Sequence, residues 1–213
     1  MKRLIITVDR NTPGKHDFNG AFQPESFALA KKWGVARADI VNVDLGKPEE
    51  KRRRQVLTAV ASAPPGLEVV AFLCHGLRTR LPQLGWNRTN VGTLAGAIAK
   101  VSPPTVRVVL YACSTGEGTG ADGDGGFADA FRDALCVAGA TDCQVDAHER
   151  AAHTTKNPYL RRFQGLGAPS GGAGGGWIVT PKSAPWKSWR KAIDGPMRFA
   201  FPMMTTGQIL AAL

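Results

Sequence analysis

The feature that most constrains the fold is a regular alternation of short apolar runs with stretches of helical periodicity. The apolar runs are apolar on both faces, which is typical of strands buried on each side. Buried strands separated by helices form a mostly parallel sheet that is covered on both faces. We therefore predict an α/β fold with strands at 4–8, 39–43, 68–74, 105–113 and 143–147, and helices at 25–33, 48–62, 91–101 and 126–137.

The C-terminal part of the chain has a looser pattern. A glycine-rich segment at about 165–176 predicts a loop, because glycine loses the most backbone freedom on folding. Residues 177–213 predict a sixth strand at 177–180, then a short helix and an apolar tail. A length of 213 residues fits one α/β domain. We expect a single domain over 1–213, with its core in about 1–150 and a six-stranded, mostly parallel sheet.

Composition excludes a membrane-spanning chain and favours the cytoplasm. Apolar residues make up 43% and charged residues 21%, and no apolar run approaches the roughly 20 residues of a membrane span. The short N-terminal apolar run ends at Asp9 and Arg10, which indicates a first strand and not a signal peptide. The cysteines form neither a CxxC pair nor a metal-ligand spacing, so we expect reduced thiols at Cys74, Cys113, Cys136 and Cys143.

The chain is strongly basic, with a formal net charge of +10. Its densest basic cluster, KRRR at 51–54, lies in a predicted helix that has acids in its first turn. A solvated helix face explains this cluster better than a nucleic-acid patch, because there are no interleaved aromatic residues and no zinc-finger spacing. A binding module whose basic surface recruits a nucleic acid or an acidic protein is nevertheless the alternative to an enzyme.

Two reactive side chains follow neighbouring predicted strands. His75 and Gly76 end the third strand in LCHG, and Cys113 ends the fourth in YACSTG. Carboxyl ends of parallel strands meet at one edge of a sheet, and strands joined by one helix are usually neighbours about 4.8 Å apart. The sequence therefore predicts a His/Cys dyad, in which imidazole activates the thiol and the N–H groups of Gly76 and Cys113 form an oxyanion hole. Packing of a buried thiol and a satisfied polar histidine are the structural alternatives.

These residues resemble the caspase-like cysteine peptidases of clan CD. A strand ending in His-Gly comes before a strand ending in Ala-Cys, and ACSTGEGTGADGDGGFADAFRDAL is most similar to the CHAT-type members. The similarity spans about 2–147. It implies a caspase-like three-layer sandwich, cysteine endopeptidase activity on a protein or peptide, and either a monomeric or an oligomeric arrangement. Some members of the clan need calcium, for which Asp122 and Asp124 are candidates, although solvation of a glycine loop explains these acids as well.

The residue pattern departs from the caspases at the substrate pocket. Tyr111 stands where caspases have a glutamine, so their specificity for aspartate at P1, the substrate residue before the scissile bond, does not follow. Asp9, Glu117 and Asp146 are the acids that could line a pocket for a basic P1 residue, and helix capping or loop solvation are the alternatives. His148 follows the fifth strand and is a further candidate for substrate contact.

Metal and nucleotide sites are not predicted. The histidines of AHERAAH, His148 and His153, are five residues apart, whereas a zinc-binding HExxH motif needs them four apart on one helical face. The glycine run at 116–126 has no Lys-Ser/Thr ending, so it is not a phosphate-binding P-loop. We expect no metal and no bound cofactor, apart from the calcium hypothesis.

Overall fold

The computed structural model describes residues 2–8, 22–119, 123–150, 159–167 and 172–177, together with Ala184 and Lys187. Its elements, in chain order, are β1 (Lys2–Val8), α1 (Phe22–Trp33), η1 (Arg37–Asp39), β2 (Val41–Val43), α2 (Glu49–Ala61), β3 (Leu67–Leu73), β4 (Arg80–Leu81), β5 (Trp86–Asn87), α3 (Val91–Val101), β6 (Arg107–Tyr111), α4 (Phe127–Val137), β7 (Gln144–His148), β8 (Leu160–Gly165) and β9 (Gly172–Trp177).

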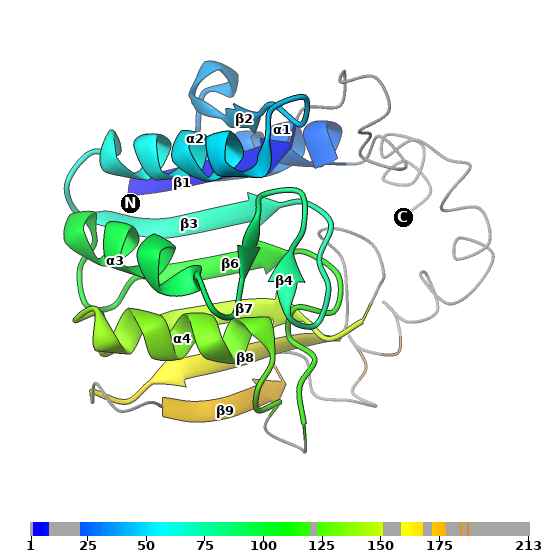
Figure 1. Ribbon diagram of the computed structural model, residues 1–213, viewed down its shortest axis with the longest axis vertical. Helices are drawn as coiled ribbons and strands as arrows, with labels where there is room; N and C mark the ends of the chain where they lie inside the picture. The colour runs from blue at the N-terminus through cyan, green and yellow to red at the C-terminus, as the bar shows by residue number, and fades with distance from the viewer. Residues whose placement is uncertain are drawn as a thin grey trace.

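The central sheet has seven strands in the order β2-β1-β3-β6-β7-β8-β9 (Figure 1). The first five of these pair in parallel, and β8 and β9 add antiparallel pairs at one edge. The predicted α/β class and the mostly parallel sheet are confirmed. Their origin is visible in the strands themselves: β3 and β6 are rich in valine, and Val70, Phe72 and Leu110 are fully buried.

Helices cover both faces of the sheet and make three layers. The chain steps from β1 to β2 in one direction, and then moves across the sheet in the other direction through β3, β6 and β7. Because crossovers between parallel strands are right-handed, this reversal places α1 on one face and α2, α3 and α4 on the other. Figure 1 shows this arrangement, with α1 behind the sheet. In open α/β sheets, ligands bind at such a reversal, which lies here at the carboxyl ends of β1 and β3.

Two strands at the sheet edge differ from the prediction. β8 was not predicted, because its alternation is obscured by two arginines, yet Phe163 is fully buried and Arg161 nearly so. β9 lies in the glycine-rich segment that we expected to be a loop. Its pairing with β8 is through the backbone, which glycine can supply without side chains. Of the strand predicted at 177–180 only Trp177 is described; the rest, and the predicted helix and tail apart from Ala184 and Lys187, lie outside the described residues.

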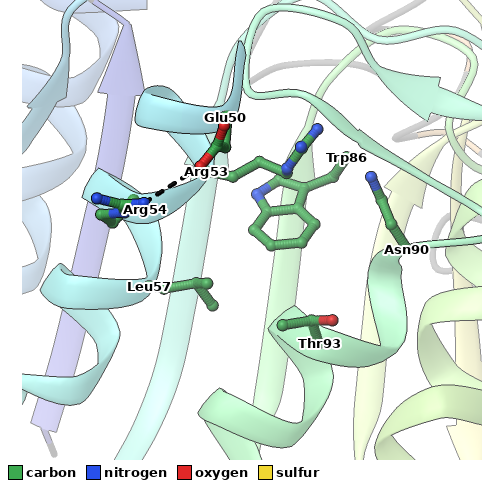
Figure 2. A pocket seen from close by; sticks show the side chains of 7 residues that line it. All are labelled: Glu50, Arg53, Arg54, Leu57, Trp86, Asn90 and Thr93. Atoms are coloured by element: carbon green, nitrogen blue, oxygen red, sulfur yellow. Dashed lines mark hydrogen bonds and ion pairs between the residues drawn. The ribbon is translucent and has the colours of Figure 1, made fainter. Parts of the chain in front are cut away.

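A short hairpin of β4 and β5 lies between β3 and α3, and the sequence did not predict it. Its Leu81 and Trp86 are buried, with Trp86 between α2 and α3 (Figure 2). Arg53 on α2 donates a hydrogen bond to the carbonyl oxygen of Gly85 at 3.2 Å, which fixes the hairpin against that helix. Among the described residues, no helix is long and apolar enough to cross a membrane.

Candidate active site

The strands that carry the predicted dyad are neighbours in the sheet. β3 pairs with β6 in parallel, and Leu73 opposite Tyr111 is the last registered pair. His75 and Cys113 each stand two residues beyond that pair, at the same level of the carboxyl edge. The two backbones stay close beyond the last registered pair: a Cβ built on Gly76 would lie 2.5 Å from the carbonyl oxygen of Cys113. Only glycine therefore fits at this position, and the predicted adjacency of the two strands is confirmed.

His75 is held from two sides. Its backbone N–H donates a hydrogen bond to Oε1 of Gln83, in the turn between β4 and β5, at 2.6 Å. The imidazole meets the ring of Phe22, the first residue of α1, edge-on at 4.8 Å between centroids. Neither contact could be predicted from the sequence, because the two partners lie outside the strand that carries His75. The hairpin and α1 together fix the position of the imidazole.

Cys113 begins a sharp turn. Ser114, the next residue, has a φ of 59°, a left-handed conformation that is uncommon outside glycine and is often found at functional sites. Thr115 is buried and donates its Oγ1–H to the carbonyl oxygen of Ala112 at 2.9 Å. The N–H of Gly116 donates to the carbonyl oxygen of His148 on β7 at 2.8 Å. The chain therefore leaves β6 abruptly just after Cys113.

The first turn of α4 binds both loops that carry the dyad. The N–H of Phe127 donates to the carbonyl oxygen of Arg78, in the loop after His75, at 2.7 Å. The N–H of Ala128 donates to the carbonyl oxygen of Thr115, in the loop after Cys113, at 2.9 Å. Helix N-termini carry unsatisfied N–H groups, and here two of them are satisfied by the loops. The end of α4 thus sets the spacing of the two loops.

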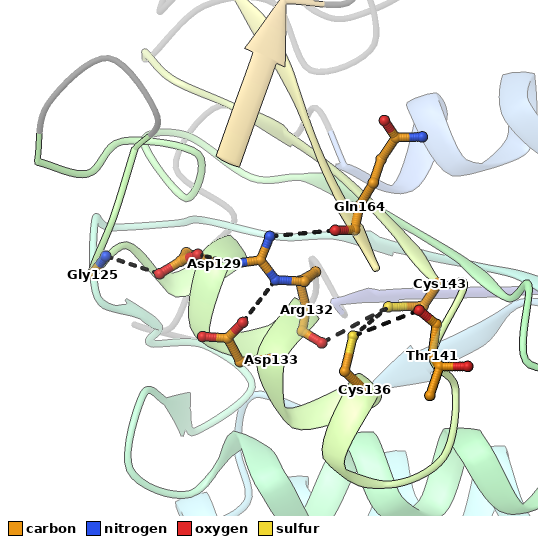
Figure 3. A network of polar contacts seen from close by, with 8 residues as sticks. All are labelled: Gly125, Asp129, Arg132, Asp133, Cys136, Thr141, Cys143 and Gln164. Atoms are coloured by element: carbon orange, nitrogen blue, oxygen red, sulfur yellow. Dashed lines mark hydrogen bonds and ion pairs between the residues drawn. The ribbon is translucent and has the colours of Figure 1, made fainter. Parts of the chain in front are cut away.

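A polar network anchors α4 in turn (Figure 3). Asp129 accepts a hydrogen bond from the N–H of Gly125 at 3.0 Å and pairs with Arg132. Arg132 also reaches Asp133, and its Nη1 lies 3.5 Å from the carbonyl oxygen of Gln164 on β8. Burial raises the pKa of Asp129 above its ordinary value. This network ties the glycine loop and β8 to the same helix.

Cys113 is the most accessible of the four cysteines. It is half-buried, whereas Cys74, Cys136 and Cys143 are buried. Burial raises the pKa of the Cys74 thiol, and it raises that of Cys143 to about 12. Cys136 and Cys143 lie with their sulfur atoms 3.9 Å apart (Figure 3). These three thiols pack in the core, where thiolate formation is disfavoured.

The structure does not bring Asp146 to the carboxyl edge. It lies within β7 opposite Val109, four residues short of the level of Cys113, or about 13 Å back along the strand. Its carboxylate is fully buried and accepts from Nε of Arg107 at 2.6 Å and from Nε of Arg162 at 2.8 Å. Asp146 is therefore an internal ion-pair partner. The prediction that it could line the substrate pocket rested on its closeness to the end of the strand in the sequence.

Tyr111 and His148 lie nearer the edge and contact each other. Their ring centroids are 6.0 Å apart in an edge arrangement, and His148 is buried. Burial raises the pKa of Tyr111; Arg107 partly opposes this rise, and the buried carboxylates of Asp146 and of Glu25 on α1 add to it. Glu25 was not singled out from the sequence, where it resembled an ordinary acid in the first turn of a helix. Tyr111, His148 and Glu25 lie on the face of the sheet that α1 covers, and the two strand residues come before the level of the dyad along the strand direction.

A cavity of about 320 Å³ lies beside Cys113 and is lined by Ser114, Glu117, Glu149 and Arg150. Glu149 pairs with Arg161 at 3.5 Å and with Arg150 at 3.8 Å. Glu117 is exposed and makes no ion pair with any residue that the structure describes. Of the predicted acids that the structure describes, Glu117 and not Asp146 lines a cavity next to the thiol.

Three candidates fall outside the described residues: Asp9, Asp122 and His153. Within the described part of the chain, no group of three or more His, Cys, Asp or Glu side chains is placed to hold a metal ion. Comparison with family models, curated proteins and solved structures found no match.

Proposed function

We propose that this protein is a caspase-like cysteine endopeptidase in which Cys113 is the nucleophile and His75 the general base and acid. The observation that carries the proposal is the position of both residues at one level of the carboxyl edge, on adjacent parallel strands. The left-handed turn at Ser114 and the shared anchor on α4 add to it, because a nucleophile needs a fixed and open position.

The reaction needs only the groups of this edge. The His75 imidazole takes the thiol proton, and the sulfur attacks the carbonyl carbon of the scissile peptide bond. The Gly76 amide makes no hydrogen bond to a described residue, so it can donate to the developing oxyanion together with the N–H of Cys113. The C–N bond then breaks, and the imidazolium gives its proton to the leaving amine. Water, deprotonated by His75, hydrolyses the thioester and releases the acid and the free thiol.

The cavity beside Cys113 is the candidate P1 pocket in this proposal. Glu117 gives its wall a carboxylate without an ion-pair partner among the described residues, which favours arginine or lysine at P1. Tyr111 and His148 lie on the face of the sheet that α1 covers, before the carboxyl edge, and their role is to support that edge. Asp146 has no part in substrate recognition. Because the proposed nucleophile must remain a reduced thiol, we place the enzyme in the cytoplasm.

Cleavage of a fluorogenic peptide library varied at P1 tests the proposal, with and without calcium. Cys113→Ala and His75→Ala should each lower cleavage by at least about a thousandfold. Cys136→Ala is the matched control, since it removes a packed thiol away from the edge, and it should keep the wild-type rate. Retained cleavage in either dyad variant, or silence of the wild type across the library, would overturn the assignment.

A further inference from the structure

A groove runs between α2 and α3 on the outer surface of their layer. It consists of a cavity of about 360 Å³ at the start of both helices and one of about 540 Å³ toward their ends, and Leu57 and Thr93 line both. We call this continuous hollow the α2–α3 groove, with Arg54 and Trp86 at its first end and Lys100 at its second. It has no part in the proposed peptidase site.

The groove is open because one wall is built from very small residues. A Cβ added to Gly92 or Gly96 would meet no atom within 4 Å. The opposite side of α3, with Leu94 and Ile98, faces the core. Leu57 on α2 is half-buried across the groove. The small-residue wall thus leaves apolar surface that a side chain from another molecule can reach.

A buried donor without a partner lies at the first end. Trp86 is only 2% exposed, and its indole Nε1 has no hydrogen-bond partner among the described residues. Buried polar groups are nearly always satisfied, and an unmade hydrogen bond is unfavourable. Figure 2 shows the indole nitrogen on the side of the ring that faces α2, next to Arg53. The nitrogen itself is inaccessible, so an acceptor oxygen from a ligand in the groove reaches this N–H once the neighbouring Arg53 side chain moves aside.

Charge at the groove selects an acidic ligand. Arg54 pairs with Glu50, which lines the same cavity, and the Arg54 side chain is 74% exposed. Lys100 lines the second end and makes no ion pair with any residue in the described part of the chain. Both helices also begin at the first end, where their dipoles favour anions. A second copy of this surface would bring like charges together.

The C-terminal stretch of the chain itself is also a poor match by charge. Residues 188–213 contain Arg190, Lys191 and Arg198 against Asp194 as the one acid. Nucleic acid offers phosphates but no apolar side chains for the small-residue wall. The groove combines an apolar wall, the unpaired N–H of Trp86 and the basic side chains of Arg54 and Lys100. This combination therefore points to a protein segment with one acidic and one apolar face.

We propose that the α2–α3 groove binds an acidic amphipathic helix of a partner protein. Apolar residues of that helix, spaced three and four apart, would pack on Leu57 and against Gly92 and Gly96. A glutamate or aspartate carboxylate near one end accepts the N–H of Trp86 beside Arg54. The peptidase edge lies at the carboxyl ends of the strands, so partner binding leaves it open.

A displayed library of 14-residue helical peptides tests the proposal, with apolar and charged positions varied independently. Selection on the full chain should enrich peptides that carry leucine-like residues on one face and a net negative charge. An enriched peptide is then labelled, and its affinity is measured by fluorescence anisotropy against the wild type and three variants.

Gly96→Leu places a side chain in the groove at a position where a Cβ meets no atom within 4 Å, and it should lower affinity at least about thirtyfold. Trp86→Phe removes the donor and should lower affinity roughly fivefold, measured well below the Tm of the variant because the smaller ring also leaves a cavity in the core. Ala28→Leu is the matched control: it adds a leucine at an exposed position on α1, on the opposite face of the sheet, and affinity should not change.

Three results would overturn the proposal. The first is that no enriched peptide loses affinity in Gly96→Leu, and the second is that the enriched peptides are neutral or basic. The third is that the wild type and Trp86→Phe bind the peptide with equal affinity. A duplex DNA and a single-stranded RNA are measured in parallel. Salt-sensitive binding of these nucleic acids without binding of any peptide, lost in Lys100→Glu, would assign Arg54 and Lys100 to nucleic-acid binding and refute the acidic helix. None of these readouts depends on cleavage, so failure of the peptidase proposal leaves this test intact.

Discussion

Replacing Gly76 by alanine perturbs the point where the two site loops touch. The added methyl would lie 2.5 Å from the carbonyl oxygen of Cys113 and 2.8 Å from both Cβ of Ala112 and Cγ2 of Thr115. The backbones must separate by about 0.9 Å to restore ordinary contact at 3.4 Å with the carbonyl oxygen. None of the three atoms belongs to a flexible side-chain end, so the strain cannot be relieved locally.

The magnitude follows from this overpacking. Forcing an extra methyl into a packed site destabilises by about 2 kcal/mol, which lowers Tm by roughly 4–8 °C in a domain of this size. A displacement approaching 1 Å between nucleophile and base lowers cleavage by about a hundredfold in the protein that remains folded. Calorimetry measures the first effect, and cleavage at a temperature well below the transition measures the second.

Gly96→Ala is the control for this prediction, because its methyl meets no atom within 4 Å. It should raise stability by about 0.5–1 kcal/mol, since alanine has the higher helix propensity, and leave cleavage unchanged. If Gly76→Ala kept the wild-type Tm and rate, the loops would not be in contact as described, and the geometric argument for the dyad would fail.

Other predictions concern the charged groups and the packed thiols. Glu117→Gln should reduce cleavage after arginine roughly fivefold and leave cleavage after leucine unchanged, as kcat/KM values on matched peptides will show. Asp146→Asn should destabilise by about 2 kcal/mol in urea unfolding, because it leaves Arg107 and Arg162 unpaired, although both are partly exposed and regain water; a change in P1 preference would instead return Asp146 to the substrate site. Burial raises the pKa of Cys143 from 9.0 to about 12, so above pH 9 the unfolded chain loses this proton while the folded chain keeps it. Stability should therefore fall as pH rises from 9 toward 12, and urea midpoints at about pH 8 and about pH 10.5 should differ less for Cys143→Ala than for the wild type; equal differences would contradict burial of this thiol.

The parallel half of the fold could be predicted because its signal is local. β3 and β6 are continuous apolar runs, and helical stretches of the right length separate them. β8 and β9 could not be predicted in this way. The buried Arg161 pairs with Glu149, and the glycines of β9 form a strand because β8 offers backbone groups to pair with. Both facts are tertiary, and neither leaves a periodic pattern.

The candidate site also has a part that could be predicted from local sequence and a part that depends on tertiary contacts. Strand ends predicted that His75 and Cys113 meet at one edge, since that requires only strand order. The contacts that orient them come from α1, the hairpin and α4, through Phe22, Gln83 and Phe127, whose roles depend on how separate elements pack. The position of Asp146 needed the register of β7 against its neighbours, where two arginines neutralise it.

The measurement that tests the central claim most directly is the rate at which iodoacetamide alkylates Cys113 as a function of pH, in the wild type and in His75→Ala. It needs no substrate, and mass spectrometry separates this thiol from the three buried ones. If imidazole and thiol form a pair, the wild-type rate reaches half its maximum well below the roughly 8.5 of a free cysteine, and His75→Ala moves that midpoint upward. Coincident profiles for the two proteins would show that His75 does not act on Cys113, and the peptidase proposal would lose its basis.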